Sequence, residues 1–513
     1  MGATFRDSMM WLHSWGGLVL GGLLFAIFWM GTLSVFDREI DRWMMPDTRP
    51  PLISDTVSGP VSLDTIIRSA GEFVPQGARR WQFFLPSERE PVVRFNYMTA
   101  DWDFPTVYLN PETGAPLPEQ GTWAGTRFIF PFHYSLHLHW KRIGAWLVGL
   151  ASMGMLAFLV SGTVIHGRIF ADFFTFRRSG KLPRSVLDLH NLVGVLGLPF
   201  HFAITLSGLV IFYAVYFPSV PETVYGGDRA GFNRDAYGSF QREVTGVPRG
   251  APIASLDSMA AEARETWGGA PPYLVRVWNP GDRNATVEMR RTPARSVDMV
   301  LDILYFDATT GTLLKAHTAA PILGVQRTIA GIHFVQFDHW ILRWLYFVLG
   351  LTGCALIATG FLFWVESRRK QHAARGAPGG RIVRTLAAGC VTGIIGATFA
   401  FFVANRVLPM SAHVAGYDRA ALEIWVFCLS WLLLFLLAVL KPGQVWRDQC
   451  WILCVLAGLA PPLNWLTTGD HLGRTVVQGN WAVAGMDVLL LLTGAAFAAV
   501  GWKLHRRRVR GGG

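Results

Sequence analysis

Residues 11–36 read WLHSWGGLVLGGLLFAIFWMGTLSVF, an apolar run without a single acidic or basic side chain other than His13. A helix needs about 20 mainly apolar residues to cross the hydrocarbon core of a bilayer. This run is too long for the apolar region of a signal peptide, and no small-residue cleavage site follows it. It therefore predicts a transmembrane helix that is retained in the protein.

Seven further stretches have the same character, and together they predict eight transmembrane helices. They lie at 143–165, 191–216, 341–365, 383–404, 421–440, 449–467 and 481–502. Hydrophobic side chains make up 51% of the 513 residues and charged ones 16%. This composition excludes a soluble protein of that length and makes the lipid membrane the first predicted partner.

The positions of lysine and arginine predict the orientation, because short basic loops stay in the cytoplasm. Clusters follow the second, fourth, sixth and eighth helices, at Arg168, Arg177, Arg178, Lys181 and Arg184, at Arg368, Arg369 and Lys370, at Lys441 and Arg447, and at Arg506 to Arg508. Both termini are then cytoplasmic, and two long segments face outward. The net charge of +11 is spread over four short loops and forms no aromatic-interleaved patch, which argues against a nucleic-acid partner.

These patterns predict a membrane α-helical protein with two small outer domains. The expected order is helix 1 at 1–36, outer domain 1 at 37–128, helix 2 at 129–167, a cytoplasmic loop at 168–185, helix 3 at 186–216, outer domain 2 at 217–328, helix 4 at 329–366, a cytoplasmic loop at 367–382, and an additional four-helix region at 383–513.

The two outer segments resemble each other. Ser62-Leu63-Asp64 opens a helical stretch in the first, and Ser255-Leu256-Asp257 opens one in the second. Residues 90–97 and 284–291 alternate with a period of two, which is typical of strands. Residues 107–114 and 304–311 are each a strand that runs into a Thr-Gly turn. Each outer segment is therefore predicted to be a small α+β domain.

The flanking helices repeat as well. The first helix contains Leu12-His13, Gly17 and Gly31, and the third contains Leu189-His190, Gly194 and Gly208 at identical offsets. The second helix has Phe132-His133 followed by Arg142, and the fourth has the similar pattern Ile332-His333 followed by Arg343. A parallel duplication of this kind implies a pseudo-two-fold axis along the membrane normal. Residues 383–513 have no counterpart.

The axis brings equivalent histidines to equal depth, so we expect His13 opposite His190 at the inner level and His133 opposite His333 at the outer level. Ionisable residues inside a membrane are functional by default. Two imidazoles from opposite sides are what six-coordinate haem iron requires. The pattern predicts two haem b groups, held without covalent attachment because Cys-x-x-Cys-His is missing from the sequence.

Three further histidines are candidate ligands without a symmetric counterpart: His201, His137 and His166. His201 lies eleven residues beyond His190, which is about 16 Å along the helix and about 20° around it. His137 is four residues beyond His133, so on one helix either could be the outer ligand. The alternative for any single histidine is a helix-end residue bonded to backbone or lipid headgroups. Carboxylates and cysteines are missing from the two membrane depths at which the histidines lie, which argues against a zinc site.

Five motifs in order resemble those of the PepSY-associated transmembrane family, over about residues 1–370. They are Trp11-Leu12-His13-x-x-x-Gly17, Phe132-His133-x-x-Leu136-x-Leu138, Asp188-Leu189-His190-Asn191, Pro199-Phe200-His201, and Ile332-His333 leading to Arg343. The outer domains resemble PepSY domains. The resemblance implies a bacterial inner-membrane protein linked to iron uptake, in a family whose characterised members include di-haem reductases of ferric siderophores in the periplasm.

The implied function is electron transfer from an inner to an outer haem and reduction of a periplasmic ferric complex, without covalent catalysis. The cytoplasmic loops have roughly 20 residues or fewer, and no Gly-x-Gly-x-x-Gly follows a strand, so the donor is expected to be a separate reductase or a membrane quinol. Two alternatives stay open. One is a PepSY regulator that inhibits a periplasmic protease. The other is a transporter, for which only Glu423 and Asp487 approach mid-membrane charges.

Overall fold

The computed structural model describes residues 4–49, 62–166, 182–216, 219–293, 296–375 and 379–511. These residues form two compact units. The helical unit comprises Met1–Met45, Gly121–Leu209 and Trp340–Gly513, and the sheet unit comprises Pro46–Gln120 and Val210–His339.

Eight helices of the described residues are long and apolar enough to cross a membrane, which confirms the predicted number of spans. They cover Phe5–Ser34, Trp140–Ile165, Pro183–Ile211, Trp340–Ser367, Gly379–Val407, Arg419–Leu440, Val445–Thr468 and Trp481–Arg507. Polar caps begin two of them: the Thr4 hydroxyl accepts from the Asp7 amide, and the Asp418 carboxylate accepts from the Ala421 amide. Such caps satisfy amides that have no partner within the helix.

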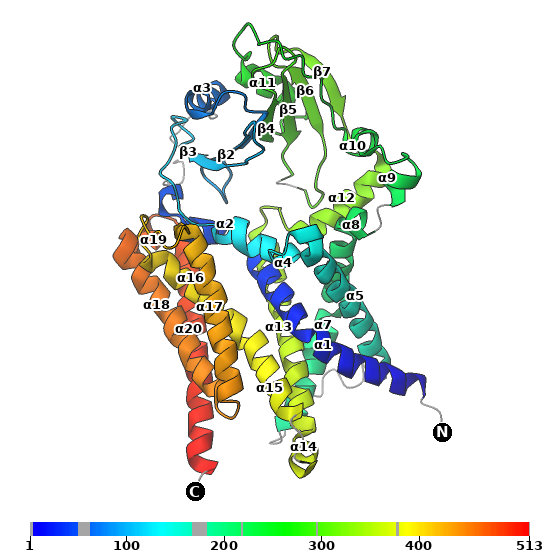
Figure 1. Ribbon diagram of the computed structural model, residues 1–513, viewed down its shortest axis with the longest axis vertical. Coiled ribbons are helices and arrows are strands. Elements are labelled where there is room, and N and C mark those ends of the chain that lie inside the picture. The colour runs from blue at the N-terminus through cyan, green and yellow to red at the C-terminus, as the bar shows by residue number, and fades with distance from the viewer. Residues whose placement is uncertain are drawn as a thin grey trace. The chain divides into compact units, whose positions relative to one another are not determined.

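The duplicated helices are α1 (Phe5–Ser34), α5 (Ile143–Ile165), α7 (Leu182–Ile211) and α13 (Trp340–Ser367), and α1 packs against both α5 and α13 (Figure 1). The additional region contains α15 (Gly379–Cys390), α16 (Thr392–Val407), α17 (Arg419–Leu440), α18 (Val445–Thr468), α19 (Leu472–Val477) and α20 (Trp481–Gly511). Helix α16 packs on α17 and α18, and α18 packs on α20. A short helix, α14 (Arg369–Arg375), lies between the two groups in the sequence.

The segment 129–167, expected as one helix, is divided in the structure. A π-helical turn, η2 (Ala124–Ile129), leads into α4 (Phe130–Ser135), and α5 begins only after the 3-10 turn η3 (Trp140–Arg142). Leu136 and His137 between them have left-handed backbone angles, with φ of 52° and 53°. An α-helix cannot continue through such residues. The equivalent segment divides in the same way, because α12 (Pro321–Phe334) ends at the left-handed Val335 before α13.

Both ends of the first expected outer domain pack with the helical unit instead. Helix α2 (Asp37–Met44) contacts η2 and α20. The Asp41 carboxylate accepts hydrogen bonds from the Gly125 amide at 2.7 Å and the Thr126 hydroxyl at 2.6 Å. Residues 37–45 and 121–128 therefore belong with the membrane helices, whereas 46–120 belongs to the sheet unit.

The two predicted α+β domains share one sheet. The first repeat contributes α3 (Leu63–Phe73), β1 (Arg80–Phe84), β2 (Val93–Met98) and β3 (Thr106–Leu109); the second contributes α11 (Leu256–Thr266), β4 (Pro272–Trp278), β5 (Thr286–Arg291), β6 (Ile303–Asp307) and β7 (Leu313–His317). The antiparallel order is β3-β2-β1-β4-β5-β6-β7, so β1 and β4 join the repeats. The unit also contains η1 (Pro46–Thr48), α8 (Tyr213–Tyr216), α9 (Ser219–Thr223) and α10 (Arg229–Tyr237).

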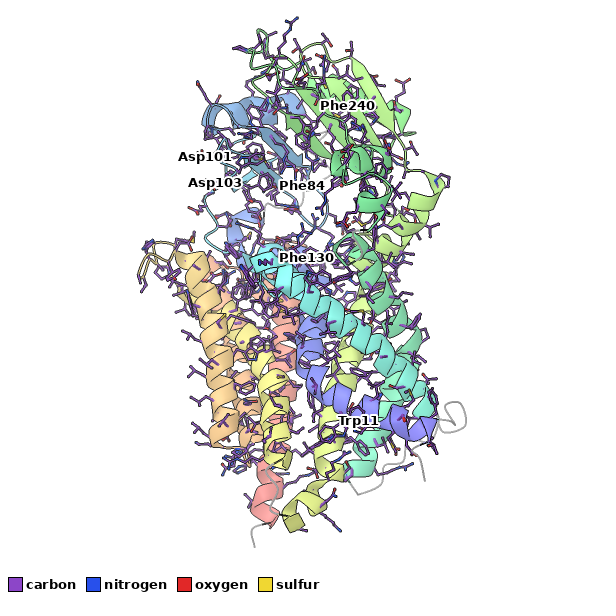
Figure 2. The ribbon with its side chains drawn as sticks, turned by 45° about the vertical axis from the view of Figure 1, so that its right-hand side comes forward. Trp11, Phe84, Asp101, Asp103, Phe130 and Phe240 are labelled. Atoms are coloured by element: carbon purple, nitrogen blue, oxygen red, sulfur yellow. The ribbon has the colours of Figure 1, made fainter. Side chains whose placement is uncertain are left out.

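The repeated Ser-Leu-Asp motifs cap each other's helices. The Asp64 carboxylate accepts from the Leu256 amide and the Ser255 hydroxyl, and the Asp257 carboxylate accepts from the Leu63 amide and the Ser62 hydroxyl. Helices α3 and α11 cover one face of the sheet, where alternate residues such as Phe83, Phe95, Val275 and Val287 form the core. On the other face, Tyr305 of β6 packs with Phe240, which Figure 2 labels.

Candidate functional site

His13 of α1 and His190 of α7 face each other in the helical unit. Their ring centroids lie 6.3 Å apart, and the ring planes are nearly perpendicular at 87°. Both residues are half-buried. The structure thus brings together the pair that the duplication predicted for the inner level.

Each of these rings is held through its Nδ1 atom. Nδ1 of His13 lies 3.1 Å from the Phe158 carbonyl oxygen, and Nδ1 of His190 lies 3.0 Å from the Leu356 carbonyl oxygen. A carbonyl only accepts hydrogen bonds, so Nδ1 must carry the proton in both rings. The Nε2 atom of each neutral ring then keeps its lone pair, which is the arrangement of a histidine prepared to bind a metal.

Equivalent residues of the two repeats surround the His13 and His190 rings. The Ser161 hydroxyl lies 3.1 Å from Nδ1 of His13, and the Thr359 hydroxyl lies 3.2 Å from Nδ1 of His190. In the next position of each helix is a glycine. A Cβ atom at Gly162 would lie 3.2 Å from Cε1 of His13, and one at Gly360 would lie 3.4 Å from Cε1 of His190. These glycines leave room for the rings.

His133 of α4 has the same tautomer. Its Nδ1 atom lies 2.8 Å from the Ile27 carbonyl oxygen of α1, which leaves Nε2 as the lone-pair nitrogen. A Cβ atom at Gly31 would lie 2.6 Å from both Cε1 and Nδ1 of this ring, so a larger residue there would have to displace the ring. His333, its expected counterpart, is near the end of α12 and belongs to the sheet unit. The pairing of His133 with His333 stays a prediction.

His137 and His201 are bonded through the other nitrogen. Nε2 of His137 lies 2.8 Å from the Phe128 carbonyl oxygen, and its ring stacks on Phe128 with 5.0 Å between centroids. Because α4 ends at Ser135, His133 and His137 do not share a helical face as expected. Nε2 of the fully buried His201 lies 3.3 Å from the Leu349 carbonyl oxygen. In both rings the free lone pair is then on Nδ1.

His166 stands apart from the pair. It is the residue at which α5 ends, and its amide donates to the Gly162 carbonyl at 3.0 Å. Its ring contacts neither His13 nor His190 in the part of the chain that the structure describes. Within the same residues, no three His, Cys, Asp or Glu side chains gather as a metal site would require.

The donor set around His13 and His190 fits haem iron. The ring centroids lie 6.3 Å apart, and in each ring Nδ1 is engaged by a backbone carbonyl, so Nε2 would be the nitrogen that holds a metal. Two neutral imidazoles in an apolar bundle are a common ligand set of b-type haem proteins. The residues present are therefore of the type that the predicted cofactor takes as ligands, and the cofactor itself stays a prediction.

The additional helices contain buried polar groups that the histidine pattern did not reveal. Glu423 of α17 is fully buried, forms an ion pair with Arg419 at 3.3 Å, and accepts from Asn405 and Thr122. Arg419 is the first residue of α17, so this pair lies at the end of the span and not in its middle. The sequence signal for it is an acidic residue four positions after an arginine in an apolar helix.

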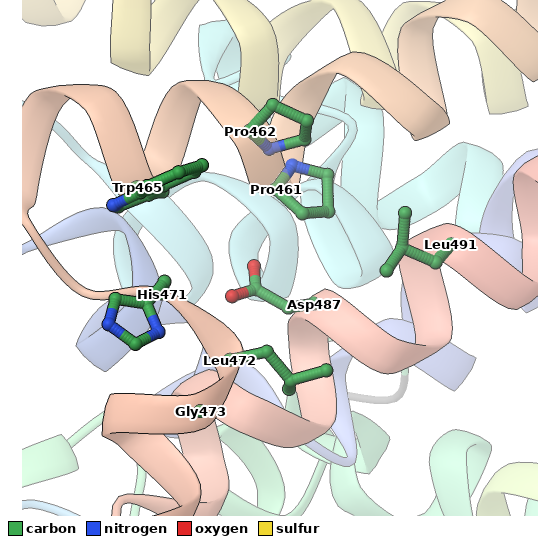
Figure 3. Close-up of a pocket in the computed structure, with 8 residues that line it drawn as sticks. All are labelled: Pro461, Pro462, Trp465, His471, Leu472, Gly473, Asp487 and Leu491. Atoms are coloured by element: carbon green, nitrogen blue, oxygen red, sulfur yellow. The ribbon is translucent and has the colours of Figure 1, made fainter.

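Asp487 of α20 points into a cavity of about 510 Å³ (Figure 3). The cavity is lined by Pro461, Pro462, Trp465, His471, Leu472, Gly473, Asp487 and Leu491. The carboxylate accepts from the Trp43 indole at 2.8 Å and the Asn464 amide at 3.3 Å. These bonds tie α20 to α2 and α18, so the two buried acidic residues Glu423 and Asp487 stabilise helix packing.

The fold and the site define a multi-span membrane protein with a duplicated histidine-bearing core and a two-repeat sheet unit. The model of the PepSY-associated TM region family matches residues 10–367, and the chain belongs to this family. The match includes His13, His133, His190 and His333 and ends before α15. The chain is also 27% identical over 392 residues to a Pseudomonas aeruginosa protein named uncharacterized protein PA4219, an alignment that covers 71% of this chain and 91% of that protein.

Proposed function

We propose that this protein is an inner-membrane electron-transfer protein that holds two haem b groups and reduces a ferric complex, such as a ferric siderophore, in the periplasm. The observation that carries the proposal is the His13–His190 pair, in which both Nδ1 atoms are engaged by backbone carbonyls and the ring centroids lie 6.3 Å apart.

In this proposal His13 and His190 would hold the inner haem, and the sequence duplication assigns His133 and His333 to the outer haem. The carbonyls of Phe158 and Leu356 accept from the ligand rings, fix their orientation and raise the basicity of Nε2. When bound, the haem groups supply one-electron exchange at potentials that the apolar bundle helps to set.

Two levels of histidine support transfer across the membrane. His133 contacts Ile27, fourteen residues after His13 on α1, which corresponds to about 21 Å along that helix. Arg368 and Arg369 follow the end of α13, so the positive-inside rule assigns the His13 level to the cytoplasmic side. A separate cytoplasmic reductase or a membrane quinol is the proposed electron donor.

The sheet unit is the proposed periplasmic part that receives the ferric complex. Reduction transfers one electron to Fe(III), and ligands selected for the ferric ion bind Fe(II) more weakly, so the iron is released. The chain's own contribution is positioning, because neither a nucleophile nor a general acid is needed for an electron to move.

The test is a reduced-minus-oxidised visible spectrum of the detergent-purified protein, with haem per chain quantified. We expect two b-type haem groups in the wild type and the loss of one in His13→Ala and in His190→Ala. The matched control is His505→Ala, in the exposed C-terminal end of α20, which should keep both groups. A colourless wild-type protein from haem-replete cells would refute the proposal and favour a regulatory role for the sheet unit.

A further inference from the structure

The sheet unit presents arginine and aromatic side chains on the face opposite its apolar core. Arg80 of β1 pairs in register with Trp278 of β4, and Phe84 of β1 pairs with Arg94 of β2. Side chains of paired residues point to the same face of a sheet. Figure 2 labels Phe84 at the end of β1, and Asp101 and Asp103 in the loop after β2.

Guanidinium groups and rings are interleaved on this face. Cζ of Arg80 lies 4.7 Å from the ring centroid of Phe104 and 5.3 Å from that of Trp278. Cζ of Arg94 lies 4.0 Å from the ring centroid of Phe84. Cation–π contacts at these distances hold the side chains in place. Phe104 remains 41% exposed and Arg80 is half-buried, so a ligand can reach both.

Positive charge is in excess around Glu288 of β5. The single carboxylate of Glu288 accepts from Arg276 at 2.9 Å and from Arg290 at 2.6 Å, so two guanidinium groups share one negative charge. Arg94 has its own partner, Glu90, at 2.8 Å. Arg80 differs from these, because its buried Nε atom has no hydrogen-bond partner among the described residues.

The electrostatics around Arg80 favour an added anion. Burial lowers the pKa of Arg80 and the positive charge of Arg276 lowers it further; the carboxylate of Glu288 raises it, but the net pKa stays below the ordinary value. A guanidinium nevertheless stays protonated in proteins, so the unfavourable charge persists until an anion approaches. Its planar array of donors matches pairs of oxygen atoms on one ligand.

We propose that this face, made of Arg80, Phe84, Arg94, Phe104 and Trp278, binds the organic ligand of the ferric complex and selects anionic, aromatic chelates such as catecholates. The inference rests on the proposed function. Catecholate oxygens would accept from the guanidinium of Arg80, and the flat catechol ring would stack on Trp278 or Phe104. An uncharged chelate would gain nothing from the excess positive charge.

The experiment measures binding of gallium(III) complexes to the full-length protein in detergent by isothermal titration calorimetry. Gallium(III) resembles Fe(III) in its complexes but is not reduced, so binding is separated from electron transfer. We expect the anionic tris-catecholate complex to bind more tightly than an uncharged tris-hydroxamate complex. The difference should shrink as salt is raised, because exposed charges are screened.

Arg80→Gln should weaken binding of the tris-catecholate about ten-fold or more, the loss typical of one hydrogen bond to a charged group. Arg80→Lys keeps the charge and should recover part of the affinity. The matched control is Arg79→Gln, whose side chain belongs to the opposite face by strand alternation and stacks on the exposed Trp102 at 4.5 Å. The control should bind like the wild type.

The possible outcomes separate this inference from the proposed function. Unchanged affinity in Arg80→Gln, or equal affinity of the wild type for both complexes, overturns the binding face. Binding that depends on Arg80 in a protein without haem supports the face and contradicts the proposed function. Two haem groups in Arg80→Gln, together with a raised KM and unchanged kcat for reduction of the ferric tris-catecholate, support both.

Discussion

Arg343 and Glu39 form a doubly hydrogen-bonded ion pair inside the helical unit, with Nη1–Oε1 and Nη2–Oε2 distances of 3.1 and 2.9 Å. Arg343 is fully buried and also donates to the Val35 carbonyl at 2.7 Å. Its guanidinium lies 4.8 Å from the ring centroids of both Phe36 and Trp340. The pair therefore joins the start of α13 to the end of α1 and to α2.

Replacing Arg343 by glutamine should destabilise the protein strongly. The change leaves the Glu39 carboxylate buried without its counter-charge, and breaking a buried pair in this way costs about 3–5 kcal/mol. Thermal unfolding in detergent should show a clear fall in Tm. Arg142, the equivalent arginine of the first repeat, is exposed, so Arg142→Gln should change the Tm little. Similar Tm values for the two variants would contradict a structural role for the ion pair.

The sequence predicts the duplication but not how its halves diverge. Apolar length alone locates all eight spans, because a bilayer sets a minimum helix length. The identical offsets of His13 and His190 predict that they meet, and they do. Arg142 and Arg343 also match in sequence, yet one is exposed and the other buried. That difference depends on Glu39, which comes from a segment assigned to the outer domain by its polarity.

Backbone breaks and strand partners were beyond the sequence patterns. Leu136 and Val335 have left-handed angles although neither residue type favours them, so tertiary packing overrides local preference. The pairing of β1 with β4 joins strands of two repeats that are far apart in the chain. Period-two alternation identifies strands but does not say which edges meet. The tautomers of His13, His190 and His137 could not be predicted either, because they depend on the carbonyls of Phe158, Leu356 and Phe128 that each ring contacts in the folded protein.

The proposed function predicts that Gly31→Ala removes the outer haem and spares the inner one. A Cβ atom at this position would lie 2.6 Å from two atoms of the His133 ring, so the ring must leave the Ile27 carbonyl. The haem content, quantified from the visible difference spectrum, should fall to one group per chain. Gly485→Ala in α20 is the control, because nothing lies within 4 Å of its added Cβ. Full haem content in Gly31→Ala would argue against His133 as a ligand.

The proposed function also predicts that Ser161→Ala and Thr359→Val raise the midpoint potential of the inner haem without loss of haem. Each change removes a hydroxyl oxygen that accepts a hydrogen bond from Nδ1–H of His13 or His190. Without this bond Nε2 is less basic, and a less basic ligand stabilises Fe(III) less. The carbonyl contacts remain, so the rings keep their orientation. Potentiometric titration followed by visible absorbance measures the shift. Thr163→Ala is the control, since its hydroxyl donates to the Leu159 carbonyl and not to a ligand ring. An equal shift in all three variants would assign the effect to helix packing.

Glu288 should make the sheet unit sensitive to acid. Burial alone would raise the pKa of Glu288, but the positive charges of Arg276 and Arg290 and the hydrogen bonds from Trp278 and Arg290 outweigh it and hold the pKa below its ordinary value. A carboxylate with a lowered pKa in the folded state stabilises the fold above its unfolded pKa, and this contribution is lost as the pH falls through the folded pKa.

The stability of the wild type should therefore decline below the ordinary glutamate range, near pH 4. Glu288→Gln should lower stability at neutral pH, because two guanidinium groups lose their shared counter-charge, and should flatten the acid decline. Unfolding of the full-length protein, followed by tryptophan fluorescence between neutral and acidic pH, measures both effects. Glu72→Gln on the exposed surface of α3 is the control and should keep the wild-type profile. If Glu288→Gln declined in acid as steeply as the wild type, other carboxylates would have to carry the pH dependence.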